Sequence, residues 1–138
     1  MNEPQFDVRF DEDAYKEYTK LDDSVAVLVD HALEQLELRA NEVGKMLANS
    51  QSTKLHGCKE MKLRSAGIRI VFRVTNQVVD VLRIVYVLTI EKRQNDIVFR
   101  TADQRLRRFK IKTDLKTYFS QSRKWKRRRQ RNKPDKVT

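Results

Sequence analysis

Apolar and polar residues alternate along three short segments of the chain, and this is the spacing of a half-buried strand. A fourth segment is longer, rich in β-branched residues and apolar on both sides. The four predicted strands span residues 5–10, 58–64, 68–74 and 78–90. Short turns at 65–67 and 75–77 separate the last three strands, so we expect them to form an antiparallel meander.

Helical spacing of apolar residues predicts three helices. The first covers 11–21, where Asp11 and the two acidic residues after it supply a cap and a negative first turn. The second is long and amphipathic, starts near residue 24 and ends between 39 and 49. The third covers 97–108. The order predicts an α+β fold, in which two N-terminal helices cover one face of a small antiparallel sheet and a C-terminal helix and basic tail follow.

Charge divides the chain into two parts, a body at 1–108 and a basic extension at 109–138. The formal net charge is +11, and residues 123–136 hold nine Lys or Arg and one acid. Such a surface favours polyanions, and nucleic acid is the first candidate. The tail lacks an apolar face, which argues against a membrane partner. A single cysteine, no apolar leader in residues 1–10 and no apolar run long enough for a bilayer together predict a cytoplasmic protein.

The outward positions of the predicted meander are unusually rich in charge. If the apolar residues of the hairpin face the helices, the alternation places five charged residues on the other, exposed face of the sheet. They are Glu60, Lys62, Arg64, Arg69 and Arg73. A cationic sheet face of this kind suits an RNA phosphate backbone.

Two segments resemble a known family of toxins. Residues 55–74, with the sequence LHGCKEMKLRSAGIRIVFRV, resemble the central hairpin of RelE-type toxins of the RelE/ParE superfamily. Residues 91–106, EKRQNDIVFRTADQRL, resemble the last strand and terminal helix of the same family. The resemblance covers roughly residues 5–108.

The resemblance implies a ribosome-associated endoribonuclease that cuts mRNA in the A site of the 30S subunit, contacts rRNA and is held inactive by a cognate antitoxin. It also implies an active site of lysines and arginines on the concave sheet face, usually with a tyrosine. Lys62, Arg69 and Arg93 match cations of that cluster. Glu60 stands where the family has a lysine, and Phe99 where it has the tyrosine.

The reaction that the resemblance implies is attack of an RNA 2′-hydroxyl on the neighbouring phosphate, with no metal or cofactor. It needs a base, positive charge around the phosphate and an acid at the leaving oxygen. We assign the phosphate to Arg69 and Arg93, because a guanidinium forks onto phosphate oxygens. Lys62 serves as base if neighbouring cations favour its neutral form. Glu60 is either an alternative base or a neutralising partner of an arginine.

Further cations and two aromatic residues are candidate RNA contacts. For the sheet arginines the alternative is a solvated surface, and for the tail it is a solvated charge run. The candidates are Lys54, Lys59, Arg64, Arg73, Phe99, Trp125, Arg127, Arg128 and Arg129, with both aromatic rings expected to stack on bases.

Two other functions compete with the ribonuclease. One is a ParE-like toxin that inhibits DNA gyrase on the same fold. The other is a nucleic-acid-binding protein without catalysis, which the departures at Glu60 and Phe99 keep open. Mapping mRNA 5′ ends on translating ribosomes separates the three.

Overall fold

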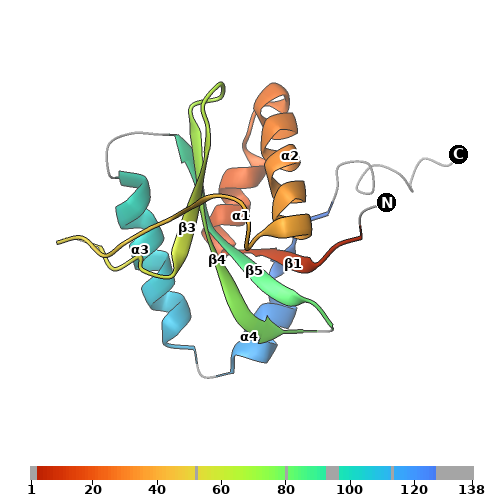
Figure 1. Cartoon of the computed structure of the whole chain (residues 1–138), viewed down its shortest axis with the longest axis vertical. Coiled ribbons are helices and arrows are strands. Elements are labelled where there is room, and N and C mark those ends of the chain that lie inside the picture. The colour runs from red at the N-terminus through yellow and green to blue at the C-terminus, as the bar shows by residue number, and fades with distance from the viewer. Residues whose placement is uncertain (1–2, 52, 80, 93–96, 113, 127–138) are drawn as a thin grey trace, which may run out of the picture.

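A six-stranded sheet lies between two pairs of helices in the computed structural model, which describes residues 3–51, 53–79, 81–92, 97–112 and 114–126 (Figure 1). The α+β fold class is confirmed. The elements follow in the order β1 (Phe6–Phe10), α1 (Glu12–Thr19), α2 (Asp23–Arg39), β2 (Lys45–Met46), β3 (Cys58–Leu63), β4 (Ile68–Val78), β5 (Arg83–Lys92), α3 (Ile97–Lys110), α4 (Leu115–Gln121) and β6 (Arg123–Lys124).

The strands lie in the order β2-β3-β4-β5-β1-β6. Neighbours β3, β4 and β5 are antiparallel, as the short turns predicted, whereas β1 is parallel to β5. The turn predicted at 75–77 is wrong, because β4 continues to Val78. Polar groups of Thr75 explain the difference: its hydroxyl donates to the Ile84 carbonyl at 2.9 Å, and its carbonyl accepts from Arg83 at 3.1 Å. Because of these hydrogen bonds, the polar segment 75–77 remains part of strand β4.

One face of the sheet packs on α1 and α2. Alternate apolar residues of β1, β4 and β5 point here, and Phe10, Ile70 and Phe72 are fully buried against Leu33 and Leu36 of α2. The predicted start of the first helix is confirmed, since the Asp11 carboxylate accepts from the backbone N–H groups of the next turn. This face is the main hydrophobic core.

The opposite face is covered by α3 and α4 (Figure 1). Val71 and Tyr86 are fully buried there against Leu106 of α3 and Phe119 of α4. The expectation of an open cationic sheet face is therefore wrong for most of its area. The sequence did not reveal this second core, because Val71 stands between Arg69 and Arg73 and the segment therefore resembled an exposed cationic face.

The beginning of the predicted basic extension is part of the folded body. Helix α3 passes residue 108, α4 begins at an Asp114 cap, and β6 pairs with β1. Trp125 is only 2% exposed, and its indole N–H donates to Asp30 Oδ1 at 3.1 Å. The expectation that Trp125 stacks on RNA is wrong, because the ring fills the core between β1 and α2. No helix of the described residues is long and apolar enough to cross a membrane.

Candidate active site

Three charged residues form a row across the central strands, on the face that α3 partly covers. Lys62 of β3 stands opposite Arg69 of β4, and Arg69 stands opposite Glu91 of β5. Glu60 lies two residues from Lys62 along β3 and therefore shares this face. The structure thus brings together Glu60, Lys62 and Arg69, three of the four residues predicted as catalytic. The fourth, Arg93, lies outside the described residues.

Arg69 is the cation of this row whose side chain is most firmly fixed by its contacts. Its Nε lies 2.9 Å from Glu60 Oε1, and its side chain is largely buried. Neither atom makes an aligned hydrogen bond within the described residues, so the contact is electrostatic. The Arg69 guanidinium also lies over the Phe99 ring of α3, 4.7 Å from its centre. Glu60 and Phe99 therefore fix this guanidinium from two different elements.

Lys62 is more open than Arg69. It is half-buried and lines a shallow depression of about 370 Å³ together with Lys45 and Arg64, both exposed, and with Glu60. Three cations and one carboxylate therefore line this depression. Buried Arg69 stands opposite Lys62 on the neighbouring strand.

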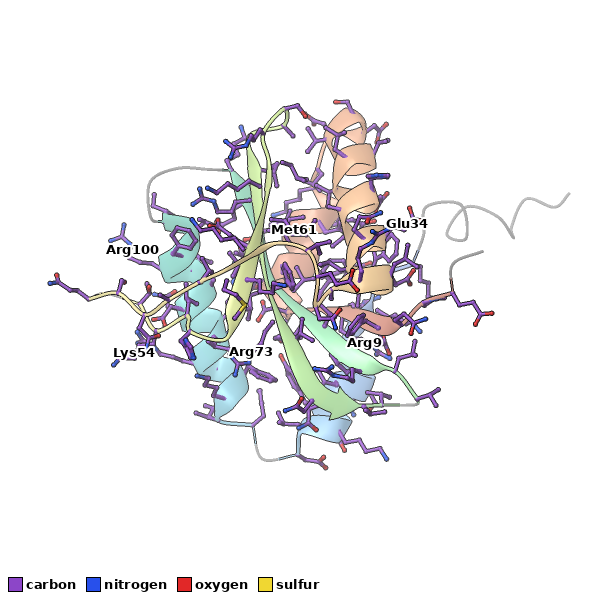
Figure 2. The ribbon with its side chains drawn as sticks, viewed as in Figure 1. Arg9, Glu34, Lys54, Met61, Arg73 and Arg100 are labelled. Atoms are coloured by element: carbon purple, nitrogen blue, oxygen red, sulfur yellow. The ribbon has the colours of Figure 1, made fainter. Side chains whose placement is uncertain are left out.

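The loop between β2 and β3, described at residues 47–51 and 53–57, forms the other side of the site. Lys54 is exposed there, as expected of an RNA contact, and its backbone N–H donates to Asp103 Oδ1 at 2.9 Å. Figure 2 shows Lys54 and Arg100 beside α3, and Glu34 on the opposite side of the sheet beside α2. The loop and α3 therefore lie on the side of the sheet that carries the charged row.

Two predicted RNA contacts have structural roles instead. Lys59 lies on the opposite face, 9% exposed, and its Nζ donates to the Ala40 carbonyl at 3.3 Å at the end of α2. Successive residues of a strand alternate in direction, so Lys59 points away from the face that carries Glu60 and Lys62. Arg73 is half-buried and donates to the His56 carbonyl at 3.4 Å, which fastens loop 47–57 to β4. The tail candidates Arg127, Arg128 and Arg129 lie outside the described residues.

An ionic clamp that the sequence did not predict joins α3 to α1. Arg105 donates to both carboxylate oxygens of Glu17, at 2.9 and 2.8 Å, and to the Leu88 carbonyl at 2.9 Å. Although partial burial opposes it, Glu17 raises the pKa of Arg105 above its ordinary value. Arg108 donates to Asp11 at 3.1 Å. These partners are far apart in sequence, so no local pattern reveals them, yet they position the helix that carries Phe99.

The described residues contain no group of three or more His, Cys, Asp or Glu side chains able to hold a metal ion.

Comparison with known proteins identifies the family. No protein-family model matches the chain. A putative RelE-like toxin protein of Escherichia coli is 32% identical over 108 residues, which cover 75% of this chain and 99% of the relative. The mRNA interferase toxin RelE of Escherichia coli is 35% identical over 100 residues, which cover 70% of this chain and 93% of that toxin. The chain belongs to the RelE toxin family.

Solved RelE structures share the fold. A mutant of Escherichia coli RelE in the free state superposes with a TM-score of 0.57 and 27% identity, over 75% of this chain and 99% of that one. The toxin-antitoxin complex RelBE of Escherichia coli contains a chain that superposes with a TM-score of 0.50 and 31% identity, over 65% of this chain and 99% of that one. These two structures thus cover between 65% and 75% of this chain.

Proposed function

We propose that this RelE-family protein is the toxin of a type II toxin–antitoxin pair and inhibits translation by cutting mRNA on the ribosome. The observation that carries the proposal is the cross-strand pair of Lys62 and Arg69. Arg69 is held by Glu60 and Phe99, within a fold whose relatives include an mRNA interferase. RNA is the polyanion that such a cationic face is suited to bind.

The reaction that these groups support is internal transesterification without a metal ion. Lys62 takes the proton of the 2′-hydroxyl, O2′ forms a bond to phosphorus, and the bond from phosphorus to O5′ breaks. Arg69, joined by Arg93, stabilises the negative charge that develops on the phosphate oxygens. The leaving O5′ takes a proton from solvent. The products are a 2′,3′-cyclic phosphate and a 5′-hydroxyl end.

Glu60 acts on this reaction through Arg69. Its carboxylate lies 2.9 Å from Arg69 Nε and is 5% exposed, a position suited to orienting the guanidinium. Within the described residues no hydrogen bond involves the terminal nitrogens of Arg69, so these nitrogens are available for phosphate. We therefore favour a positioning role for Glu60 over the role of general base.

Other cations bind the RNA backbone around this centre. Arg64 and Lys54 are exposed on the two sides of the charged row. The basic residues Arg127, Arg128 and Arg129 add charge for rRNA. The partner that neutralises the toxin is a cognate antitoxin with an acidic or amphipathic segment. A similar chain occurs in a toxin-antitoxin complex, the RelBE complex of Escherichia coli, which supports a partner of this class. The place of action is the cytoplasm, where the ribosomes are.

The decisive experiment adds the purified protein to translating ribosomes and maps mRNA 5′ ends together with their chemistry. We expect cuts within the A site that leave 5′-hydroxyl ends. Lys62→Ala and Arg69→Lys should each slow cleavage by about 10²-fold or more. Lys116→Ala, at an exposed lysine of α4, is the matched control and should cut normally.

Two results would contradict the proposal. Ends that carry a 5′-phosphate would show that water, not the 2′-hydroxyl, attacks the phosphate. Absence of cuts together with inhibition of DNA supercoiling would support a ParE-like activity instead.

A further inference from the structure

Two adjoining pockets lie between α1, α4 and β6, and we call them together the β6 groove. Their volumes are about 350 and 380 Å³, and both are lined by Phe10, Tyr15, Ser122 and Arg123. In the sheet, β6 lies four strand spacings from β3, the strand of Lys62, which is roughly 19 Å. We propose that the β6 groove binds an unpaired segment of RNA at a site separate from the charged row.

The β6 groove is formed partly by residues that follow the family resemblance. That resemblance covers roughly residues 5–108, whereas α4 and β6 lie between Leu115 and Lys124. None of the residues that line the groove takes part in the cleavage reaction described above. The inference therefore goes beyond the proposed ribonuclease function and can be tested without cleavage.

The charged side chains around the groove are mostly cations, and all of the cations are exposed. Four cations and one carboxylate line the two pockets: Lys16, Arg123, Lys124, Lys126 and Glu12. Lys16 Nζ lies 3.7 Å from Asp13 Oδ1. Lys124 Nζ lies 4.0 Å from Asp7 Oδ1. Because exposed ion pairs of this length contribute little, both lysines can turn to a phosphate instead.

Arg123 is presented in a way that suits a phosphate. Its guanidinium lies over the Tyr15 ring, 5.0 Å from Cζ to the ring centre. Stacking uses the face of a guanidinium and leaves the N–H groups at its edge free, and these groups fork onto phosphate oxygens. Among the described residues no carboxylate and no hydrogen-bond acceptor binds this side chain. Its charge is therefore available for an anionic ligand.

Strand β6 is held in place by buried groups, so the groove exists before a ligand binds. Arg9 of β1 is buried, and its Nη1 donates to the carbonyls of Phe119 and Ser122 at 3.0 Å each. On the other side of β6, Trp125 N donates to the Val8 carbonyl at 2.8 Å. A preformed site lowers the entropy cost of binding.

Aromatic rings accompany the cations of the groove. Tyr15 and Tyr118 are half-buried, so each exposes part of its ring. Rings on which bases stack, combined with a cationic surface, are typical of sites for single-stranded nucleic acid. A paired base is not available for such stacking, so we expect single-stranded RNA to bind more tightly than a duplex. The rings also favour RNA over an acidic peptide, for which charge alone would be enough.

The sequence that follows the groove adds to its positive charge. Residues 127–138 continue directly from Lys126 and hold six Lys or Arg and one acid. A polyanion is the class of ligand that complements both the groove and this segment.

The test uses RNA that the proposed reaction cannot cut. A short, labelled, single-stranded RNA with 2′-O-methyl groups throughout lacks the nucleophile, so fluorescence anisotropy measures binding alone. Arg123→Ala and Lys126→Ala each remove one cation of the groove in the full-length protein. Arg39→Ala removes an exposed arginine at the end of α2, outside the groove, and is the matched control. Each variant is also combined with Lys62→Ala, which weakens binding at the charged row.

We expect Arg123→Ala to weaken binding of the single-stranded RNA by about tenfold. The slope of log affinity against log salt should become shallower by about 0.7, the contribution of one phosphate contact. Lys126→Ala should change both quantities in the same direction, and Arg39→Ala should bind as the wild type does. The losses should be the same in the Lys62→Ala background, because the two sites are separate.

Three results would overturn the proposal. The first is an affinity and a salt slope that Arg123→Ala and Lys126→Ala leave at the level of Arg39→Ala. The second is binding of an RNA duplex as tight as that of the single strand, which would exclude stacking of bases. The third is an oligoglutamate of equal charge that binds as tightly as RNA and is weakened equally by Arg123→Ala. That result would indicate an acidic protein segment as the occupant.

Crosslinking on translating ribosomes identifies the source of the RNA. Gln121 is exposed and lines the groove, so a photoreactive amino acid in its place probes the occupant. Crosslinks to mRNA or to rRNA would each support the proposal and name the source, whereas crosslinks to ribosomal proteins alone would overturn it. If the wild type makes no cuts in mRNA, the proposed ribonuclease function fails, and the anisotropy still decides whether the β6 groove binds RNA.

Discussion

Removal of the Trp125 side chain should destabilise the whole domain, although this residue stands in the most basic segment of the sequence. The ring is 2% exposed within the core between β1 and α2, and its N–H donates to Asp30. Truncation of a buried tryptophan to alanine costs roughly 3–5 kcal/mol, the loss of the hydrogen bond included. For a domain of this size we expect Tm to fall by roughly 12 °C.

Two truncations separate the described part of the C-terminal segment, which ends at Lys126, from residues 127–138. Deletion of residues 123–138 removes β6 and Trp125, and we expect a loss of stability comparable to that of Trp125→Ala. Deletion of residues 127–138 removes most of the tail charge and leaves the core contacts of Trp125 in place. This shorter truncation should unfold at nearly the wild-type temperature while binding RNA with a smaller salt dependence.

Thermal unfolding followed by circular dichroism measures these differences, and fluorescence provides an independent check. Trp125 is the only tryptophan of the chain, so its emission reports on this single site. We expect emission at short wavelength in the folded protein and a shift to longer wavelength on unfolding. Wild-type stability in Trp125→Ala, or emission typical of a solvated ring in the folded protein, would refute the assignment of this residue to the core.

Three further predictions concern the site and its supports. Glu60→Gln should keep measurable cleavage with a reduced rate, because Arg69 loses its counter-charge; complete loss of cleavage with intact ribosome binding would favour a general base. Gly44→Ala should cost more stability than Gly67→Ala in urea unfolding, since both have positive φ but only at Gly44 would a Cβ meet backbone, 2.9 Å from the Glu60 carbonyl oxygen; equal costs would contradict this contact. Burial raises the pKa of Asp11 above its ordinary 3.8, so the folded state holds that proton more tightly and ionisation of Asp11 opposes folding. The free energy of unfolding of the wild type should therefore fall relative to Asp11→Asn as the pH rises from about 3.8, and a difference that does not vary with pH would contradict this.

The sequence predicted the elements of the candidate site but not their full surroundings. Alternation along β3 and β4 placed Glu60, Lys62 and Arg69 on one face, because a strand has a period of two residues. Lys59 and Arg73 were candidate RNA contacts, but the fold uses both side chains internally: Lys59 donates to the Ala40 carbonyl and Arg73 to the His56 carbonyl. Whether a cation on a strand faces solvent depends on the helix or loop that packs above it, and this packing has no local signal in the sequence.

The C-terminal segment is a second case in which the sequence did not reveal which side chains are buried. Its composition indicated a solvated tail, because nine of fourteen residues from 123 to 136 are Lys or Arg. A single strand pairing changes this picture: β6 lies against β1, and the next residue, Trp125, enters the core. The average composition of a segment does not show that a single side chain among many charged ones is buried.

The sequence by itself determined the α+β class, the starts of α1, α2 and α3, the antiparallel order of β3, β4 and β5, and the family resemblance, because these depend on periodicity, capping and short motifs that are local in the chain. Only the tertiary structure decided that α3 and α4 cover the second sheet face and that Glu17 and Asp11 clamp α3. It also placed the Phe99 ring between Arg69 and a pocket. These features join residues that are distant in sequence, and their energies depend on burial and on charge partners that exist only after folding.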